Sequence, residues 1–164
     1  MIKLTNEYMK LNEKELMLVG GKAGIGKTRF IVNEVNNSQR DNKVLFLSLE
    51  ASKDKLMYDY KLQVSNNLTV IDTKTNIDDL KNYLEKEYDY IYIDHLGLFS
   101  DDVISTLKKL VDYINEYNVK VFMTDYIAIN EKDDKYNDEK YNLLTSIYVL
   151  KEETINKLKL KINQ

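Results

Sequence analysis

The eight residues from Gly21 to Thr28 carry the clearest chemical signal in this 164-residue chain. They match the pattern G-x-x-x-x-G-K-[ST], in which glycines let backbone N–H groups converge on phosphate oxygens at the positively polarised start of a helix. Lys27 would reach the β- and γ-phosphates, and the Thr28 hydroxyl would bind Mg²⁺. We therefore predict a phosphate-binding loop, or P-loop, that binds ATP and Mg²⁺ through Gly21, Lys22, Ala23, Gly24, Ile25, Gly26, Lys27, Thr28 and Arg29.

The residues on either side of the loop favour this prediction. An apolar run, LMLV, occupies residues 16–19, and apolar residues resume at helical spacing with Phe30, Ile31, Val32 and Val35. A strand before the loop and a helix after it are the context that this motif requires. That context disfavours the alternative, a glycine-rich turn with an accidental lysine.

Two carboxylates at the ends of later apolar runs are candidates for binding the metal and positioning the attacking water. Asp94 ends the run YDYIYID and is the expected Walker B aspartate, while Glu50 ends KVLFLSLE and would position the water, because His95 and not a glutamate follows Asp94. Each residue also has a simpler interpretation. Asp94 could cap the next turn, Glu50 could be an acidic residue favoured at the start of a helix, and His95 could be a hydrogen-bonded residue in the wall of the site. The predicted catalytic residues are Glu50, Lys27 and Asp94, and the predicted metal ligands are Thr28 and Asp94.

The elements that must hold these groups alternate along the chain. Short apolar runs suited to buried strands occupy residues 16–19, 43–49, 68–72, 89–94 and 119–124, and segments of helical spacing lie between them. This alternation predicts a three-layer α/β fold, with a mostly parallel central sheet and helices on both faces, as one domain over residues 1–164. Two more strands, at 146–150 and 156–162, are expected to form a C-terminal hairpin.

One edge of this sheet is the expected site, because ligands of open α/β sheets bind beyond the carboxyl ends of the strands. The P-loop, Glu50, Asp94 and Asp125 all follow strands and fall at that edge. A polar, turn-rich loop is expected from Asp125 to Leu144.

Composition narrows the function classes. With 43% hydrophobic and 31% charged residues, the chain is typical of a folded protein and not of a disordered one. The absence of cysteine excludes disulfides and thiol catalysis, and a single histidine excludes a His-rich metal site. We find neither a membrane-spanning run nor a signal peptide, so the expected location is cytoplasmic with no membrane partner. The formal charge of −3 argues against an extensive sequence-independent nucleic-acid surface.

In order and spacing, these segments resemble the ATPase core of DnaB-type replicative helicases, within the RecA-like P-loop class. The resemblance runs from about residue 15 to the C-terminus, and its more specific parts are the SLE triplet ending at Glu50 and the D-x-L-x-L segment from Asp94. It implies that Lys27 and Thr28 bind ATP and Mg²⁺, that Asp94 supports the metal and that Glu50 positions the water. It also implies rings around single-stranded DNA, in which a neighbouring subunit completes each site.

Departures from the pattern of that family predict slow hydrolysis. Asp125 stands where the family has a glutamine, and an ionised carboxylate cannot donate a hydrogen bond. The segment Lys161-Ile162-Asn163 replaces a Lys-x-Arg pair, so the arginine finger is missing, and such fingers contribute orders of magnitude to phosphoryl transfer. In the expected DNA-contacting loop, acidic residues at positions 133, 134, 138 and 139 offset the lysines.

Three functions stay open on the sequence alone. The first is a RecA-like ATPase acting in DNA replication or recombination, with a phage or mobile element as a candidate source. The second is a nucleotide-binding adaptor that docks on a helicase, loader or recombinase. The third is a dimeric ATPase of the ParA and MinD class, whose deviant P-loop GKGGxGKT resembles GKAGIGKT with Lys22 at the signature position, although Glu50 and His95 depart from it. The expected partners are ATP or ADP, and then single-stranded DNA, further copies of the chain or such a protein.

Overall fold

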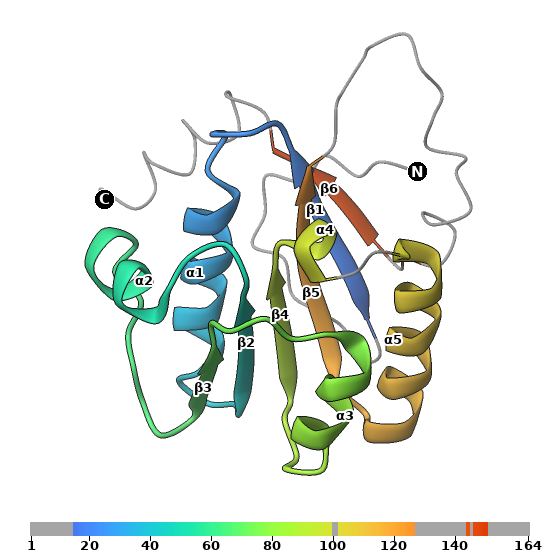
Figure 1. Cartoon of the computed structure of the whole chain (residues 1–164). Helices are drawn as coiled ribbons and strands as arrows, with labels where there is room; N and C mark the ends of the chain where they lie inside the picture. Colours follow the sequence, from blue (N-terminus) through green and yellow to red (C-terminus); the bar gives the residue numbers. More distant parts are fainter. Residues whose placement is uncertain (1–14, 100–101, 127–143, 145, 151–164) are drawn as a thin grey trace, which may run out of the picture.

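A parallel sheet of six strands lies at the centre of the structure, in the order β3-β2-β4-β5-β1-β6 (Figure 1). The computed structural model describes residues 15–99, 102–126, 144 and 146–150. The strands are β1 (Leu16–Gly21), β2 (Val44–Ser48), β3 (Leu68–Ile71), β4 (Tyr90–Asp94), β5 (Lys120–Tyr126) and β6 (Ser146–Val149). Every neighbouring pair is parallel, which confirms the predicted sheet.

Helices cover both faces of this sheet (Figure 1). One face carries α3 (Ile77–Leu84), α4 (Leu96–Phe99) and α5 (Val103–Tyr117), and the other carries α1 (Lys27–Ser38) and α2 (Lys53–Asp59). Strand side chains alternate between the two cores, so that Ile91 and Ile93 face α3 and α5, whereas Tyr92 faces α1. The three-layer α/β fold is therefore confirmed, and burial on both faces explains why the strands read as continuous apolar runs.

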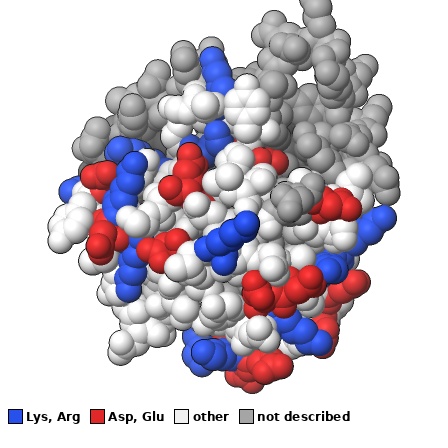
Figure 2. All heavy atoms as spheres, viewed as in Figure 1, with Lys and Arg blue, Asp and Glu red and all other residues white. Residues whose placement is uncertain are grey.

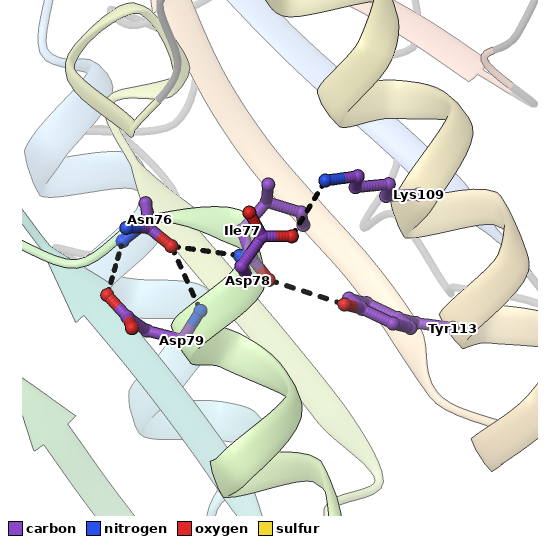
Figure 3. A network of polar contacts seen from close by, with 6 residues as sticks. All are labelled: Asn76, Ile77, Asp78, Asp79, Lys109 and Tyr113. Carbon is purple, nitrogen blue, oxygen red and sulfur yellow. Dashed lines mark hydrogen bonds and ion pairs between the residues drawn. The ribbon is translucent and has the colours of Figure 1, made fainter.

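Polar contacts at the surface join α3 to α5 (Figure 3). The ammonium of Lys109 lies 2.7 Å from Asp78 Oδ1, and the hydroxyl of Tyr113 donates to the carbonyl of Ile77 at 3.4 Å. At the start of α3, the side chain of Asn76 accepts two backbone hydrogen bonds at 2.9 Å, one of them from Asp78. The cap fixes where α3 begins, whereas the ion pair to Lys109 is exposed to solvent and contributes little.

The end of β5 corrects one prediction. The sequence predicts a polar loop from Asp125, but Asp125 and Tyr126 continue the strand and pair in register with Gly20 and Gly21 of β1. The strand extends this far because β1 itself runs to Gly21 and offers backbone hydrogen-bonding groups to its neighbour. The carboxylate of Asp125 consequently lies next to the P-loop.

Helix ends differ slightly from the predicted ones, for local reasons. The predicted helix over residues 77–88 ends at Leu84, and Glu87 takes a left-handed conformation with φ 56° just beyond it. The long helix expected from residue 101 begins at Val103, because the Asp102 side chain caps it by accepting a hydrogen bond from the N–H of Ser105 at 3.1 Å. The short helix α4 was not anticipated from the sequence.

Several predictions concern residues outside the described part of the chain. They are the second strand of the C-terminal hairpin at 156–162, the polar segment over 127–143 and the arginine-finger position at 161–163. The first strand of that hairpin is present as β6, which pairs in parallel with β1.

Strand register brings the candidate residues to one edge of the sheet. Gly20 of β1 lies beside Asp125 of β5, and Ser48 of β2 lies beside Asp94 of β4. Since all these strands run in the same direction, the segment around Glu50 and the P-loop leave the sheet at this same edge.

Candidate nucleotide-binding site

The P-loop joins β1 to α1 through two glycines with left-handed backbones. Gly24 has φ 76° and Gly26 has φ 105°, conformations that residues with a Cβ rarely adopt. Gly21 is needed for a different reason, because an added Cβ would lie 2.8 Å from the side chain of Ile25. The loop residues between Gly21 and Ile25 are exposed, so its backbone is open to a ligand.

Two carbonyls of the loop hold the side chain of Lys27 in place. Its Nζ donates hydrogen bonds to the carbonyl oxygens of Gly21 at 2.8 Å and Lys22 at 2.9 Å, and lies 5.9 Å from the centre of the Tyr126 ring. Burial lowers the pKa of Lys27, and the charges of Glu50, Asp94 and Asp125 oppose this shift. An ammonium has three N–H groups, so one is left for a phosphate after the two carbonyls are satisfied.

Asp94 is buried at the end of β4 and is held by two threonines. With 1% of its surface exposed, it accepts a hydrogen bond on Oδ2 from the hydroxyl of Thr28 at 2.9 Å and another on Oδ1 from the hydroxyl of Thr124 at 2.5 Å. Burial raises the pKa of Asp94, while the hydrogen bonds from Thr124 and Thr28 act in the opposite direction. Both donors lie far away in the sequence, which argues against a carboxylate that merely caps the next turn.

The oxygen atoms of Thr28 and Asp94 suit Mg²⁺. A hydroxyl and a carboxylate are hard donors, and Mg²⁺ is usually bound by one or two carboxylates together with phosphate oxygens and water. Within the described ranges, no cluster of three His, Cys, Asp or Glu side chains is arranged to bind a metal without further ligands. The donor set therefore fits a magnesium ion that a nucleotide helps to bind.

Glu50 lies just beyond β2, at the same edge of the sheet as Asp94. Its side chain is exposed, and its charge acts on both Lys27 and Asp94, which places it within electrostatic range of the site. The helix-start alternative for Glu50 loses support, because Ser52 caps α2 by accepting a hydrogen bond from the N–H of Lys55. The geometry is compatible with the predicted role for Glu50 in positioning water.

His95 and Asp125 form a pair beside Asp94. Nε2 of His95 lies 3.4 Å from Asp125 Oδ1, and the same oxygen accepts a hydrogen bond from the N–H of Tyr126 at 2.9 Å. Nδ1 of His95 is buried and has no hydrogen-bond partner, and the peptide bond between Asp94 and His95 is cis. Asp125 thus acts as an acceptor at the strand end, and His95 lines the wall of the site.

Arg29, the last of the predicted loop residues, lies exposed in the first turn of α1.

Thr124, which contacts the Walker B candidate Asp94 directly, was not identified from the sequence. Thr124 closes the apolar run VKVFMT, and a polar residue at a strand end was the available signal. Its partner, however, depends on β5 lying beside β4, which the sequence does not reveal.

Comparison with known proteins agrees with the fold. The chain is similar to a solved structure of an ATPase domain, with a TM-score of 0.66 and 14% identity, covering 88% of this chain and 72% of that one. It is also similar to a DnaB-like replicative helicase described with its interactions with primase, with a TM-score of 0.59 and 14% identity, covering 82% of this chain and 44% of that one. No curated protein matches the sequence at a significant level.

At 14% identity these likenesses establish the RecA-like fold alone. The family is established by the sequence, because the model of the DnaB-like helicase C terminal domain matches residues 1–151. The chain belongs to the family of DnaB-like helicase C-terminal domains.

Proposed function

We propose that this protein binds ATP together with Mg²⁺, hydrolyses it slowly and acts as a helicase-like ATPase in DNA replication or recombination. The observation that carries the proposal is the hydrogen bond from Thr28 to Asp94, beside a lysine held by the carbonyls of its own loop. A triphosphate on this loop would meet an ammonium, a hydroxyl and a metal-supporting carboxylate in one place.

The protein's own groups divide the work of binding. Backbone N–H groups of the loop and the start of α1 would bind phosphate oxygens, and Lys27 would add a fixed positive charge. Since two carbonyls already hold Lys27, little side-chain freedom is lost when a phosphate binds. When bound, Mg²⁺ would neutralise charge on the phosphates, with Thr28 and Asp94 on its protein side.

Slow hydrolysis follows from the groups around the expected water. We assign Glu50 to orient it, but Asp125 has no proton to donate to a γ-phosphate when ionised. The Asp125 carboxylate also accepts from Tyr126 and lies against His95, so it is already engaged. A site of this kind binds nucleotide well and stabilises the transition state poorly.

The mixed charge of one face favours a second candidate, a nucleotide-binding adaptor that docks on a helicase, loader or recombinase. Basic and acidic side chains are interspersed on the face shown in Figure 2, without an extended basic patch among the described residues. Since binding of DNA requires clustered positive charge, such a face suits a protein partner better than DNA. One structural relative is a DnaB-like helicase known with its interactions with primase, although this chain covers 44% of it.

We also propose one domain over residues 1–164, a cytoplasmic location, and either further copies of the chain or single-stranded DNA as partners. Among the described helices, none is long and apolar enough to cross a membrane. The family match favours the helicase-like candidate over the ParA and MinD class.

Binding and turnover of ATP separate the candidates. A fluorescently labelled ATP should bind saturably in the presence of Mg²⁺, and Lys27→Ala should abolish this binding. Turnover that single-stranded DNA stimulates, and that Glu50→Gln removes while binding persists, supports the ATPase. Binding without turnover, or turnover only with a partner protein, supports the adaptor.

Matched controls change exposed residues of the same type outside the site. Lys81 and Glu85 lie exposed at the end of α3. The variants Lys81→Ala and Glu85→Gln should bind and turn over ATP at the wild-type level. An absence of saturable binding by the wild-type protein would refute both candidates.

A further inference from the structure

We propose that Thr124 is a positioning residue for the metal, because its buried hydroxyl fixes the Asp94 carboxylate in the orientation that presents Oδ2 to Thr28. The inference rests on the proposed binding of Mg²⁺ and ATP at this site. It adds a residue from β5 to a site that the sequence assigns to the P-loop, Glu50 and Asp94.

The contact is built into the register of two central strands. β4 and β5 pair in parallel with Ile93 opposite Met123, so the next residues, Asp94 and Thr124, lie side by side at the carboxyl ends. Thr124 is 0% exposed and Asp94 is 1% exposed, so water does not compete for this hydrogen bond. The threonine lies on a strand that is paired on both sides, which makes it a rigid support.

Each oxygen of the carboxylate has its own hydroxyl donor. Oδ1 accepts from Thr124, and Oδ2 accepts from Thr28. Rotation of the carboxylate about its Cβ–Cγ bond would break both contacts. Thr124 therefore helps to fix the plane in which the carboxylate meets the hydroxyl of Thr28, the other predicted metal ligand.

A positioning role and a merely structural role predict different results. A valine at this position keeps the shape of threonine and suits a buried strand, but it removes the donor to Oδ1. If the role of Thr124 is structural alone, Thr124→Val changes thermal stability at most and leaves the magnesium requirement unchanged. If it orients Asp94, the apparent affinity for Mg²⁺ falls about 10- to 100-fold, as is typical when a partner of a metal ligand is lost.

The experiment titrates Mg²⁺ into the full chain with fluorescently labelled ATP, starting from EDTA. The affinity for labelled ATP without metal measures binding by the P-loop. The Mg²⁺ concentration at half-saturation measures the affinity of the metal site. Thr124→Val is expected to keep the metal-free affinity and to require about 10- to 100-fold more Mg²⁺. Thr124→Ser, which retains the hydroxyl, should stay close to the wild type.

A second pair of variants tests the proposal if the Thr124→Val protein does not fold. Thr124→Ala and Thr124→Ser both lack the methyl group and differ in the hydroxyl alone, so the alanine variant should require more Mg²⁺ than the serine variant. Thr69→Val on β3 is the matched control, since it removes a threonine hydroxyl that Tyr88 contacts away from the site. Its magnesium requirement should be that of the wild type.

Two failures can be told apart. If the wild type shows no binding of labelled ATP, with or without Mg²⁺, the proposed function is wrong. If the wild type binds in a magnesium-dependent way and Thr124→Val has the same half-saturating Mg²⁺ concentration, the role of Thr124 alone is refuted.

Discussion

The hydroxyl of Thr28 donates a hydrogen bond to Asp94 Oδ2 at 2.9 Å, and so ties the first turn of α1 to the end of β4. These residues lie on different elements, with β2, α2, β3 and α3 between them along the chain. The contact places a hydroxyl and a carboxylate side by side, next to the lysine of the P-loop.

Asp94→Asn should remove the magnesium dependence of nucleotide binding while the protein stays folded. The amide has nearly the same shape as the carboxylate but no charge, so it is a weak partner for Mg²⁺ or for the water around it. Because burial raises the pKa of Asp94, loss of its charge does not remove a favourable term from folding. The affinity for labelled ATP, measured with Mg²⁺ and with EDTA, checks this. If Mg²⁺ still raised the affinity of Asp94→Asn for ATP, the prediction would be wrong.

Asp125→Gln should raise ATP turnover. Glutamine brings an N–H donor to the end of β5, where Asp125 has only acceptors and contacts His95 and the N–H of Tyr126. A hydrogen bond to a charged group contributes about 1.5–3 kcal/mol, so we expect an increase of about tenfold or more. Phosphate release measures the effect, with Asp112→Asn on α5 as the control. Equal turnover in Asp125→Gln and the wild type would show that another group limits hydrolysis.

Tyr126→Trp should report nucleotide binding by fluorescence. The chain contains no tryptophan, so the variant has a single one, placed where a ring lies 5.9 Å from the ammonium of Lys27. Phosphate near that ammonium changes the field at the ring, and the emission should change saturably with ATP. Tyr58→Trp is the matched control, since Tyr58 is 74% exposed on α2. Its emission should not respond, and a silent Tyr126→Trp that still binds labelled ATP would contradict the prediction.

Gln39→Ala should destabilise the protein through a contact away from the site. The side chain of Gln39 is buried, donates to the carbonyl of Gln63 at 2.7 Å and accepts from the hydroxyl of Ser65 at 2.8 Å. Its loss removes both hydrogen bonds, each of which contributes about 0.5–1.5 kcal/mol, and should cost about 1–3 kcal/mol in the free energy of unfolding by urea. Gln63→Ala keeps the backbone carbonyl and serves as control, and equal stabilities of the two variants would rule out this role for the Gln39 side chain.

Local signals were sufficient to predict the layers and the P-loop. The strands β1, β2, β4 and β5 are apolar runs that are largely buried on both faces, and the loop depends on residues within one short segment, Gly21 to Thr28. Such features depend on residues that are close in sequence, so the hydrophobic periodicity and the P-loop motif are enough to predict them.

Contacts between elements were not predictable in the same way. Thr124 meets Asp94 only because β5 lies beside β4, and Asp125 stays in the sheet only because β1 runs as far as Gly21. Pairing of this kind depends on strand order and register, for which a single sequence holds no direct signal. The polar partners of a site are therefore harder to predict than its loop.

Glu34→Gln should make the protein more stable at neutral pH and above. Burial raises the pKa of Glu34 from 4.5 to about 7, so the folded state binds a proton that the unfolded state releases, and the free energy of unfolding falls as the pH rises from about 4.5 to about 7. Glutamine removes this dependence, and because Glu34 is partly exposed we expect a gain of about 1–3 kcal/mol at pH 8 and little change near pH 4.5. Urea unfolding of both proteins from about pH 5 to about pH 8 measures the difference, which Glu85→Gln, an exposed control, should not show. A difference that does not grow with pH would mean that Glu34 is ionised in the folded protein across this range.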